Sequence, residues 1–149
     1  MSTVAIETTT AEAMDFDAIL ALLAGAGLPT HDLSLESIKN FSLATQGGAL
    51  VGAIALERYG DVGLLRSLVV ASTRRKVGVG AALVEAAERK ARGQGLSALI
   101  LLTETAQDFF MHMGYAVTSR IDAPKAVQAS SEFAGVCPVS ATCMVKALR

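Results

Sequence analysis

A basic segment with two glycines has the residue types of a phosphate-binding loop. It reads Arg75-Lys76-Val77-Gly78-Val79-Gly80 and lies between an apolar stretch and an alanine-rich stretch. Glycine lets the backbone approach a ligand closely, and a helix N-terminus offers unpaired N–H groups and a positive dipole end. The segment therefore predicts an anion site for a diphosphate. The alternative is an ordinary tight strand-to-helix turn with solvated basic residues.

Two oppositely charged residues are expected on neighbouring strands. Arg66 interrupts an otherwise apolar strand, where a charge is costly unless it is paired, and Glu57 lies on the strand before it. A two-residue turn at Gly60-Asp61 would make them diagonal neighbours, and a turn from Gly60 to Gly63 would place them opposite each other. They form either a structural ion pair or a reactive pair. In the reactive pair, Arg66 binds a substrate carboxylate and Glu57 accepts an amine proton.

Polar residues follow the buried strand expected at 98–102. Thr103, Glu104 and Thr105 stand at its carboxyl end, where α/β proteins often place ligands. Glu104 is a second candidate base, although the dipole of the next helix would also favour an acid there. Either threonine could simply cap that helix. Arg120 is either a second candidate for binding a carboxylate or a solvated charge at the end of a strand.

The spacing of apolar and turn residues predicts an α/β (α+β) fold with a mixed sheet. Strands are expected at residues 4–8, 41–45, 49–59, 64–70, 98–102, 115–119 and 142–148. Helices are expected at residues 15–26, 34–39, 80–92 and 106–113, with an irregular or weakly helical segment at 122–135. The expected core residues include Phe16, Ile19, Leu83, Val84, Leu99, Ile100 and Phe109.

Length and composition predict one folded domain over residues 1–149. A hydrophobic fraction of 52% with a net charge of −1 argues against disorder and against a nucleic-acid or membrane partner. The N-terminus has no signal-peptide pattern and no apolar run is long enough to span a bilayer, so a cytoplasmic protein is expected. Cys137 and Cys143 fit neither a disulfide framework nor a zinc pattern, and we expect reduced, buried thiols and no metal.

In this order, the motifs resemble those of the GNAT acetyltransferases. The family signature, Arg/Gln-x-x-Gly-x-Gly/Ala after the fourth strand, is matched at Arg75, Gly78 and Gly80, and a later aromatic motif resembles the segment from Phe109 to Tyr115. The resemblance implies the acyl-CoA N-acyltransferase fold, a mixed, mostly antiparallel sheet flanked by helices. It also implies acetyl-CoA as cosubstrate, with the pantetheine arm on the fourth strand and the pyrophosphate on the loop amides. The cofactor-binding residues so implied are Leu68, Val69, Val70, Arg75, Lys76, Val77, Gly78, Val79, Gly80, Ala81 and Phe110.

One position departs from the family pattern. Many GNAT enzymes have a tyrosine as the second residue of the aromatic pair, placed to protonate the leaving thiolate, whereas here the residue is Phe110. Tyr115 resembles the packing aromatic of the family. By position, the resemblance assigns stabilisation of the oxyanion to the backbone N–H of Val70 or Leu68. Glu57, Arg66 and Glu104 are then the candidate catalytic residues.

A narrower resemblance concerns the GNAT proteins encoded in arsenic-resistance operons. It is carried by the segments Leu56 to Leu68, Leu101 to Ala106 and Glu132 to Ala134. It implies acetylation of a small, amino-acid-like primary amine. Two alternatives stay open: a protein or peptide N-terminal acetyltransferase, and a CoA-binding sensor without turnover. Dimers are common in the superfamily, so a homodimer is a further expectation.

Overall fold

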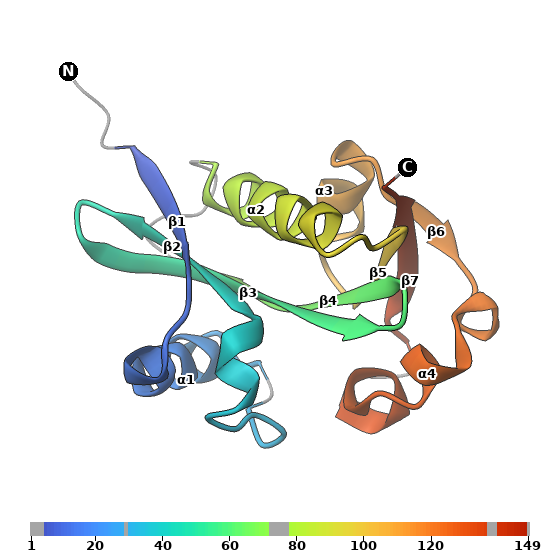
Figure 1. The fold of residues 1–149 in the computed structure, drawn as a ribbon, viewed down its shortest axis with the longest axis horizontal. Helices are drawn as coiled ribbons and strands as arrows, with labels where there is room; N and C mark the ends of the chain where they lie inside the picture. The colour runs from blue at the N-terminus through green and yellow to red at the C-terminus, as the bar shows by residue number, and fades with distance from the viewer. Residues whose placement is uncertain (1–4, 29, 72–77, 137–139, 149) are drawn as a thin grey trace. The chain divides into compact units, whose positions relative to one another are not determined.

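The computed structural model describes residues 5–28, 30–71, 78–136 and 140–148 (Figure 1). Over these residues, seven strands form a sheet in the order β1-β2-β3-β4-β5-β7-β6. The strands are β1 (Ile6–Thr10), β2 (Phe41–Gln46), β3 (Ala49–Tyr59), β4 (Val62–Val70), β5 (Ala98–Thr103), β6 (Ala116–Thr118) and β7 (Thr142–Ala147). The helices are α1 (Phe16–Gly25), α2 (Val79–Gly93), α3 (Gln107–His112) and α4 (Lys125–Gln128). The β4–β5 pairing is parallel and the β1–β2, β2–β3, β5–β7 and β6–β7 pairings are antiparallel, which confirms the predicted mixed sheet.

Most element boundaries lie within two residues of those expected, and the differences have local causes. Strand β4 begins at Val62, directly after the turn Gly60-Asp61, so the two-residue turn is the alternative that the protein adopts. The helix expected at 34–39 is reduced to a 3₁₀ turn at Ser37–Asn40. The segment expected to be weakly helical contains α4 and a π-helical stretch at Glu132–Val136.

The chain divides into two compact units, which are described separately. Unit 1 comprises Met1–Ala55 and Ser67–Ala87, and unit 2 comprises Leu56–Arg66 and Glu88–Arg149. The division falls within β3, β4 and α2. The expectation of one domain over residues 1–149 stays a prediction.

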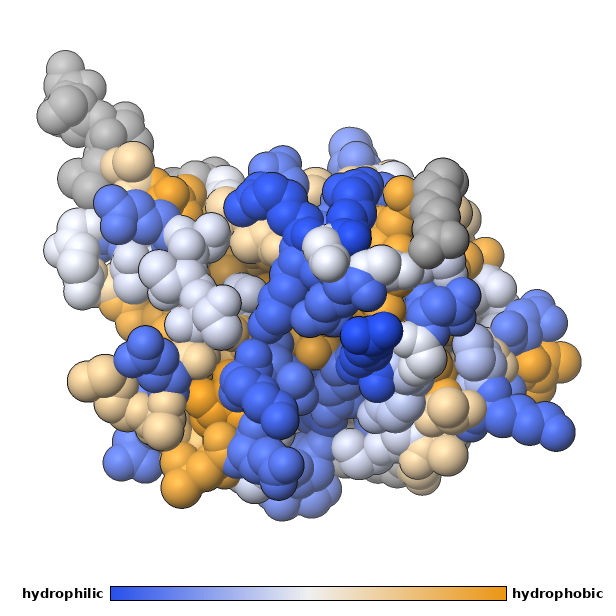
Figure 2. All heavy atoms as spheres, in the orientation of Figure 1, coloured by the Kyte–Doolittle hydropathy of each residue, from blue (hydrophilic) through white to orange (hydrophobic). Residues whose placement is uncertain are grey.

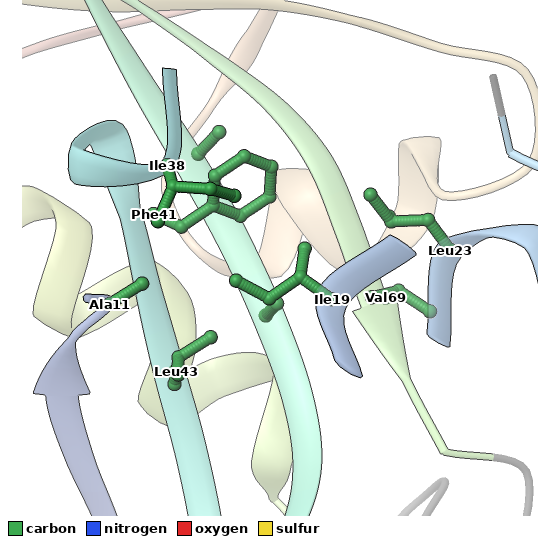
Figure 3. Packing of buried hydrophobic residues seen from close by; sticks show 9 residues of the cluster. Ala11, Ile19, Leu23, Ile38, Phe41, Leu43 and Val69 are labelled. Atoms are coloured by element: carbon green, nitrogen blue, oxygen red, sulfur yellow. The ribbon is translucent and has the colours of Figure 1, made fainter. Parts of the chain in front are cut away.

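The core of unit 1 lies between α1 and its strands (Figure 3). Ile19 and Leu23 are four residues apart and thus share one face of α1, and both are fully buried. They pack with Phe41 and Leu43 of β2 and with Val69 of β4. In Figure 1, α1 and the start of α2 lie on opposite sides of the strands of this unit.

Helix α2 is amphipathic. Its buried residues recur at helical spacing, at Val79, Leu83, Val84, Ala87, Glu88 and Ala91. Figure 2 shows hydrophilic side chains covering the face of the molecule where α2 lies, in agreement with exposed charges such as Glu85 and Arg89. One buried residue of the helix, Glu88, is itself charged, and its partners are described with the site.

The core of unit 2 surrounds β5, whose residues Leu99 to Leu102 are all buried. Strand β5 pairs with β4 on one side and with β7 on the other, so it is an interior strand of the sheet. Cys143 of β7 is buried in this core as a free thiol, as predicted, and burial raises its pKa. Cys137 lies outside the described residues.

Two predicted core residues, Phe16 and Phe109, are half-buried, and Phe16 packs against the core of unit 1. In the aromatic pair, Phe110 is the buried member. The Phe110 ring lies edge-on to Phe109 at 5.1 Å and to Tyr115 at 5.4 Å between ring centroids. Phe110 thus contacts both neighbouring aromatic rings from the short helix α3.

Candidate functional site

The start of α2 supplies the described part of the predicted phosphate loop. Gly78 has a φ of 89°, a left-handed conformation that favours glycine, and α2 begins at the next residue. The N–H of Ala82 donates to the carbonyl of Gly78 at 3.0 Å, which closes the first turn. Val79, Gly80 and Ala81 come before Ala82 in the chain, and their N–H groups point out of the helix N-terminus. Arg75, Lys76 and Val77 lie outside the described residues.

The end of β4 carries the second set of predicted cofactor residues. The N–H of Ala71 donates to the carbonyl of Val51 in β3 at 2.8 Å. Because N–H directions alternate along an extended strand, the N–H groups of Val70 and Leu68 point away from β3. They are the two groups that the family resemblance assigns to the oxyanion, and that role stays a prediction. The Val69 side chain points into the core instead.

Ser67 breaks the regular course of β4. Its φ is 59°, the left-handed region that non-glycine residues rarely occupy. Such a conformation costs roughly 1–3 kcal/mol and is often found next to binding sites. The distorted residue lies between Arg66 and the residues Leu68 to Val70. The regular alternation of N–H directions along β4 starts after it. Nothing in the sequence around Ser67 predicted it.

Gly52 of β3 is a supporting residue that sequence reasoning missed. A Cβ built there would lie 2.8 Å from Leu83 Cδ1, 2.9 Å from the Val69 carbonyl oxygen and 3.0 Å from Val79 Cγ1. Glycine at this position therefore allows the first turn of α2 to pack closely on β3 and β4. An isolated glycine inside a strand pattern is the signal that could have identified it.

In unit 2, the structure brings Arg66 together with Glu57 and adds a second carboxylate. Arg66 Nη1 lies 3.6 Å from Glu57 Oε2, and Arg66 Nε lies 3.4 Å from Glu132 Oε2. Arg66 Nη1 also donates to Ser131 Oγ at 3.2 Å. The contacts with Ser131 and Glu132 span more than 60 residues of sequence, so no local pattern could have revealed them.

Of the three charged side chains in this cluster, that of Glu57 is the most exposed to solvent. Its side chain is 20% exposed, against 2% for Arg66 and 11% for Glu132. The hydroxyl of Tyr59 donates to Glu57 Oε1 at 3.1 Å. Burial, followed by the charge and hydrogen bond of Glu57, raises the pKa of Tyr59 to about 12. The Tyr59 phenol is therefore a stable hydrogen-bond donor to the carboxylate at neutral pH.

The remaining candidate site residues, Thr103, Glu104 and Arg120, lie at the end of β5 and near β6. Glu104 is exposed in the turn after β5. Thr103 Oγ1 accepts the N–H of Ala106 at 3.0 Å, which caps the turn that leads into α3. Arg120 donates to the carbonyl of Ala141 at 3.2 Å and lies 6.0 Å from the centre of the Phe133 ring. A role of Glu104 or Arg120 in binding stays a prediction.

Tyr115 is held in a buried polar network that the sequence did not reveal. Its hydroxyl donates to Glu88 Oε2 at 2.9 Å. Lys146 Nζ donates to Glu88 Oε1 at 3.2 Å, to Glu88 Oε2 at 3.1 Å and to the carbonyl of Met113 at 2.8 Å. Glu88 is 5% exposed, so its charge depends on these partners for stabilisation. The ring of Tyr115 also packs beside that of Phe110, as expected for a packing aromatic.

Both tyrosines of the chain should ionise later than free tyrosine, and their ionisation should lower stability at high pH. Burial first, then the charge of Glu88 and its hydrogen bond, raise the pKa of Tyr115, and the pKa of Tyr59 is also raised. The folded state therefore keeps these protons above pH ~10, where unfolded tyrosine loses them. Stability due to this difference is present below pH ~10 and is lost as the pH rises further.

The measurement is the urea midpoint as a function of pH, together with tyrosinate absorbance, to which no tryptophan contributes. We expect Tyr115→Phe to flatten the decline above pH ~10, by up to about 1.4 kcal/mol per pH unit. Ionisation of both phenols near their ordinary pKa in the folded protein would contradict the prediction.

Neither a membrane-spanning helix nor a metal centre is found in the parts of the chain that the structure describes. No helix at residues 5–28, 30–71, 78–136 or 140–148 is long and apolar enough to cross a bilayer. Among the same residues, no group of three or more His, Cys, Asp or Glu side chains could hold a metal ion.

The mixed sheet, with Gly78 directly before α2, agrees with the acyl-CoA N-acyltransferase fold that the sequence resemblance implies. A profile of the Acetyltransferase (GNAT) family matches residues 21–115, and the chain therefore belongs to this family of enzymes. It is 32% identical over 104 residues to an amino-acid acetyltransferase of Ralstonia nicotianae. That match covers 68% of this chain and 23% of the relative.

Solved structures share the fold. The N-acetylglutamate synthase from Neisseria gonorrhoeae, complexed with coenzyme A and N-acetyl-glutamate, has a TM-score of 0.85 and 23% identity, over 99% of this chain and 36% of that one. Rv2747 from Mycobacterium tuberculosis, in complex with CoA and NLQ, has a TM-score of 0.82 and 20% identity, over 96% of this chain and 99% of that one. This chain thus spans about a third or less of the amino-acid acetyltransferase and the synthase.

Proposed function

We propose that this protein transfers an acetyl group from acetyl-CoA to the primary amine of a small, amino-acid-like substrate. The observation that carries the proposal is the start of α2, where Gly78 and an open first turn offer three N–H groups to a diphosphate. Membership of the acetyltransferase family supports the reaction, and the amino-acid acetyltransferase relative supports the substrate class.

The described residues fit the cofactor that the proposal requires. The N–H groups of Val79, Gly80 and Ala81 would hold the pyrophosphate, and in the sequence the positively charged Arg75 and Lys76 come just before them. The backbone of Leu68 to Val70 would hold the pantetheine arm, and the outward N–H of Val70 or Leu68 would bind the thioester oxygen. The acetyl-CoA thioester supplies the activated acyl carbon when it is bound. Phe110 has no proton to donate, so the CoA thiolate that leaves would take its proton from another group or from water.

Glu57 is the base that the geometry favours. Its carboxylate is partly exposed, and the hydrogen bond from Tyr59 fixes its orientation. An amine must lose a proton to become nucleophilic, and Glu57 can accept it directly or through a water. Glu104 is exposed in its turn and is the weaker candidate.

Thiol release from acetyl-CoA tests the function. The acceptor panel contains free amino acids, phosphinic analogues of glutamate, polyamines and short peptides. We expect release with carboxylate-bearing small amines. Release only with peptides would indicate an N-terminal acetyltransferase, and measurable cofactor binding without any release would indicate a CoA-binding sensor. Absence of cofactor binding would remove the proposal altogether.

Gly78→Ala tests the cofactor site itself. At a φ of 89°, a residue with a Cβ costs roughly 1–2 kcal/mol, although the added carbon would have no atom of the described residues within 4 Å apart from its chain neighbours. The first turn of α2 is expected to shift, and the dissociation constant for acetyl-CoA to rise about tenfold, as roughly 1.4 kcal/mol would give. The matched control is Gly93→Ala at the other end of α2, where a Cβ is also unobstructed. Equal affinity in both variants would contradict the proposed site.

Three finer assignments belong to the proposal as well. They are membership of the arsenic-resistance-operon subgroup, a cytoplasmic location and a homodimer. The sequence resemblance of Leu56 to Leu68 motivates the first. Growth protection against amino-acid-like arsenicals, cell fractionation and light scattering would test them in turn.

A further inference from the structure

The three-residue cluster around Arg66 has a geometry that limits what it can bind. The Arg66 side chain is 2% exposed, and its guanidinium lies between Glu57 on β3 and Glu132 in the π-helical stretch. Ser131 accepts a further hydrogen bond from Nη1 at 3.2 Å. A substrate carboxylate would have to displace one of the protein's own partners to reach this guanidinium.

The charge of the cluster also opposes an incoming anion. Glu57 and Glu132 both lie within ion-pair distance of the Arg66 guanidinium, so these three side chains together carry a formal charge of −1. Burial strengthens electrostatic interactions, so a further carboxylate would be repelled and an ammonium attracted. The most exposed atoms of the cluster belong to Glu57, beside the half-buried Tyr59.

We propose that Arg66 and Glu132 are positioning residues that hold the Glu57 carboxylate, and that Glu57 and Tyr59 recognise the acceptor as a cation. Arg66 is then not the ligand of a substrate carboxylate. This inference rests on the proposed function. The ion pair between Arg66 and Glu132 connects the π-helical stretch to the β3–β4 hairpin. Because Arg66 pairs with both carboxylates, it orients Glu57 without forming a tight one-to-one ion pair with it.

The acceptor specificity of Arg66→Met separates the two roles. The probes are L-glutamate and its diamide, which share the α-amine, although the diamide has no carboxylate. We expect kcat to fall about 100-fold for both acceptors in equal proportion, because a misplaced base slows either reaction, with KM for acetyl-CoA unchanged. Glu132→Gln is expected to act in the same direction on both. A loss confined to L-glutamate would overturn the proposal, since that pattern identifies a carboxylate ligand.

An unfolding cycle tests the cluster without any turnover. It compares Arg66→Met, Glu132→Gln and the double variant in urea. The two changes are expected to be non-additive by roughly threefold or more in the unfolding equilibrium constant, because each removes the other's partner. Arg58→Met is the matched control, since Arg58 is exposed on the same hairpin and should be additive with Glu132→Gln. Additivity of Arg66→Met with Glu132→Gln would overturn the proposed positioning role.

The two proposals fail in distinguishable ways. A wild-type protein that acetylates no acceptor contradicts the proposed function, while the unfolding cycle still decides whether Arg66 and Glu132 act as a unit. A wild-type protein that turns over amines, combined with additive unfolding, removes only the positioning role.

Discussion

Gly52→Ala is expected to destabilise the protein by about 2–3 kcal/mol, the upper part of the range for overpacked cores. The added carbon would lie 2.9 Å from the Val69 carbonyl oxygen, a backbone atom that cannot move without shifting β4. The two side-chain contacts, with Leu83 and Val79, belong to the first turns of α2. We therefore also expect weaker acetyl-CoA binding, because the N–H groups at the helix start would be displaced. Urea unfolding and cofactor titration measure the two effects.

The control for this change is Gly25→Ala in the same unit. Apart from the backbone of α1 and the chain neighbours, no atom of the described residues lies within 4 Å of a Cβ there, and the position is helical, so alanine should be neutral or slightly stabilising. Similar unfolding midpoints for the two variants would show that α2 does not depend on the close approach at Gly52.

Glu88→Ala is expected to cost about 3 kcal/mol, near the lower end of the values for breaking a buried ion pair. It removes the acceptor of the Tyr115 hydroxyl and leaves the Lys146 ammonium with its hydrogen bond to the Met113 carbonyl, at 2.8 Å. Lys146 keeps some contact with solvent, since its side chain is 23% exposed, which limits the penalty. The free energy of unfolding from urea titration measures the effect.

Two further variants test whether the loss of stability in Glu88→Ala comes from its buried ion pair. Glu85→Ala removes an exposed carboxylate from the same helix and should change stability by less than about 0.5 kcal/mol. Adding Lys146→Met to Glu88→Ala should restore part of the loss, because it removes the uncompensated charge. A double variant less stable than Glu88→Ala alone would show that Lys146 stabilises the fold through other contacts.

The features that depend only on residues close together in the sequence were predictable. Helix α2 and its glycine start follow from composition and spacing over a few residues, and so does the two-residue alternative for the turn at Gly60-Asp61. The buried character of β5 follows from its continuous apolar run. These features need no knowledge of distant parts of the chain, since helix ends, turns and strand periodicity are local properties.

The amino-acid order alone was enough to predict the fold class, the position of the phosphate loop and the need of Arg66 for a partner. The folded arrangement was needed to show that Arg66 also pairs with Glu132, that Glu88 joins Tyr115 and Lys146, and that Gly52 must lack a side chain. Each of these depends on atoms brought together from separate elements. The cost of a buried charge shows that a partner must exist, but only packing selects which residue provides it.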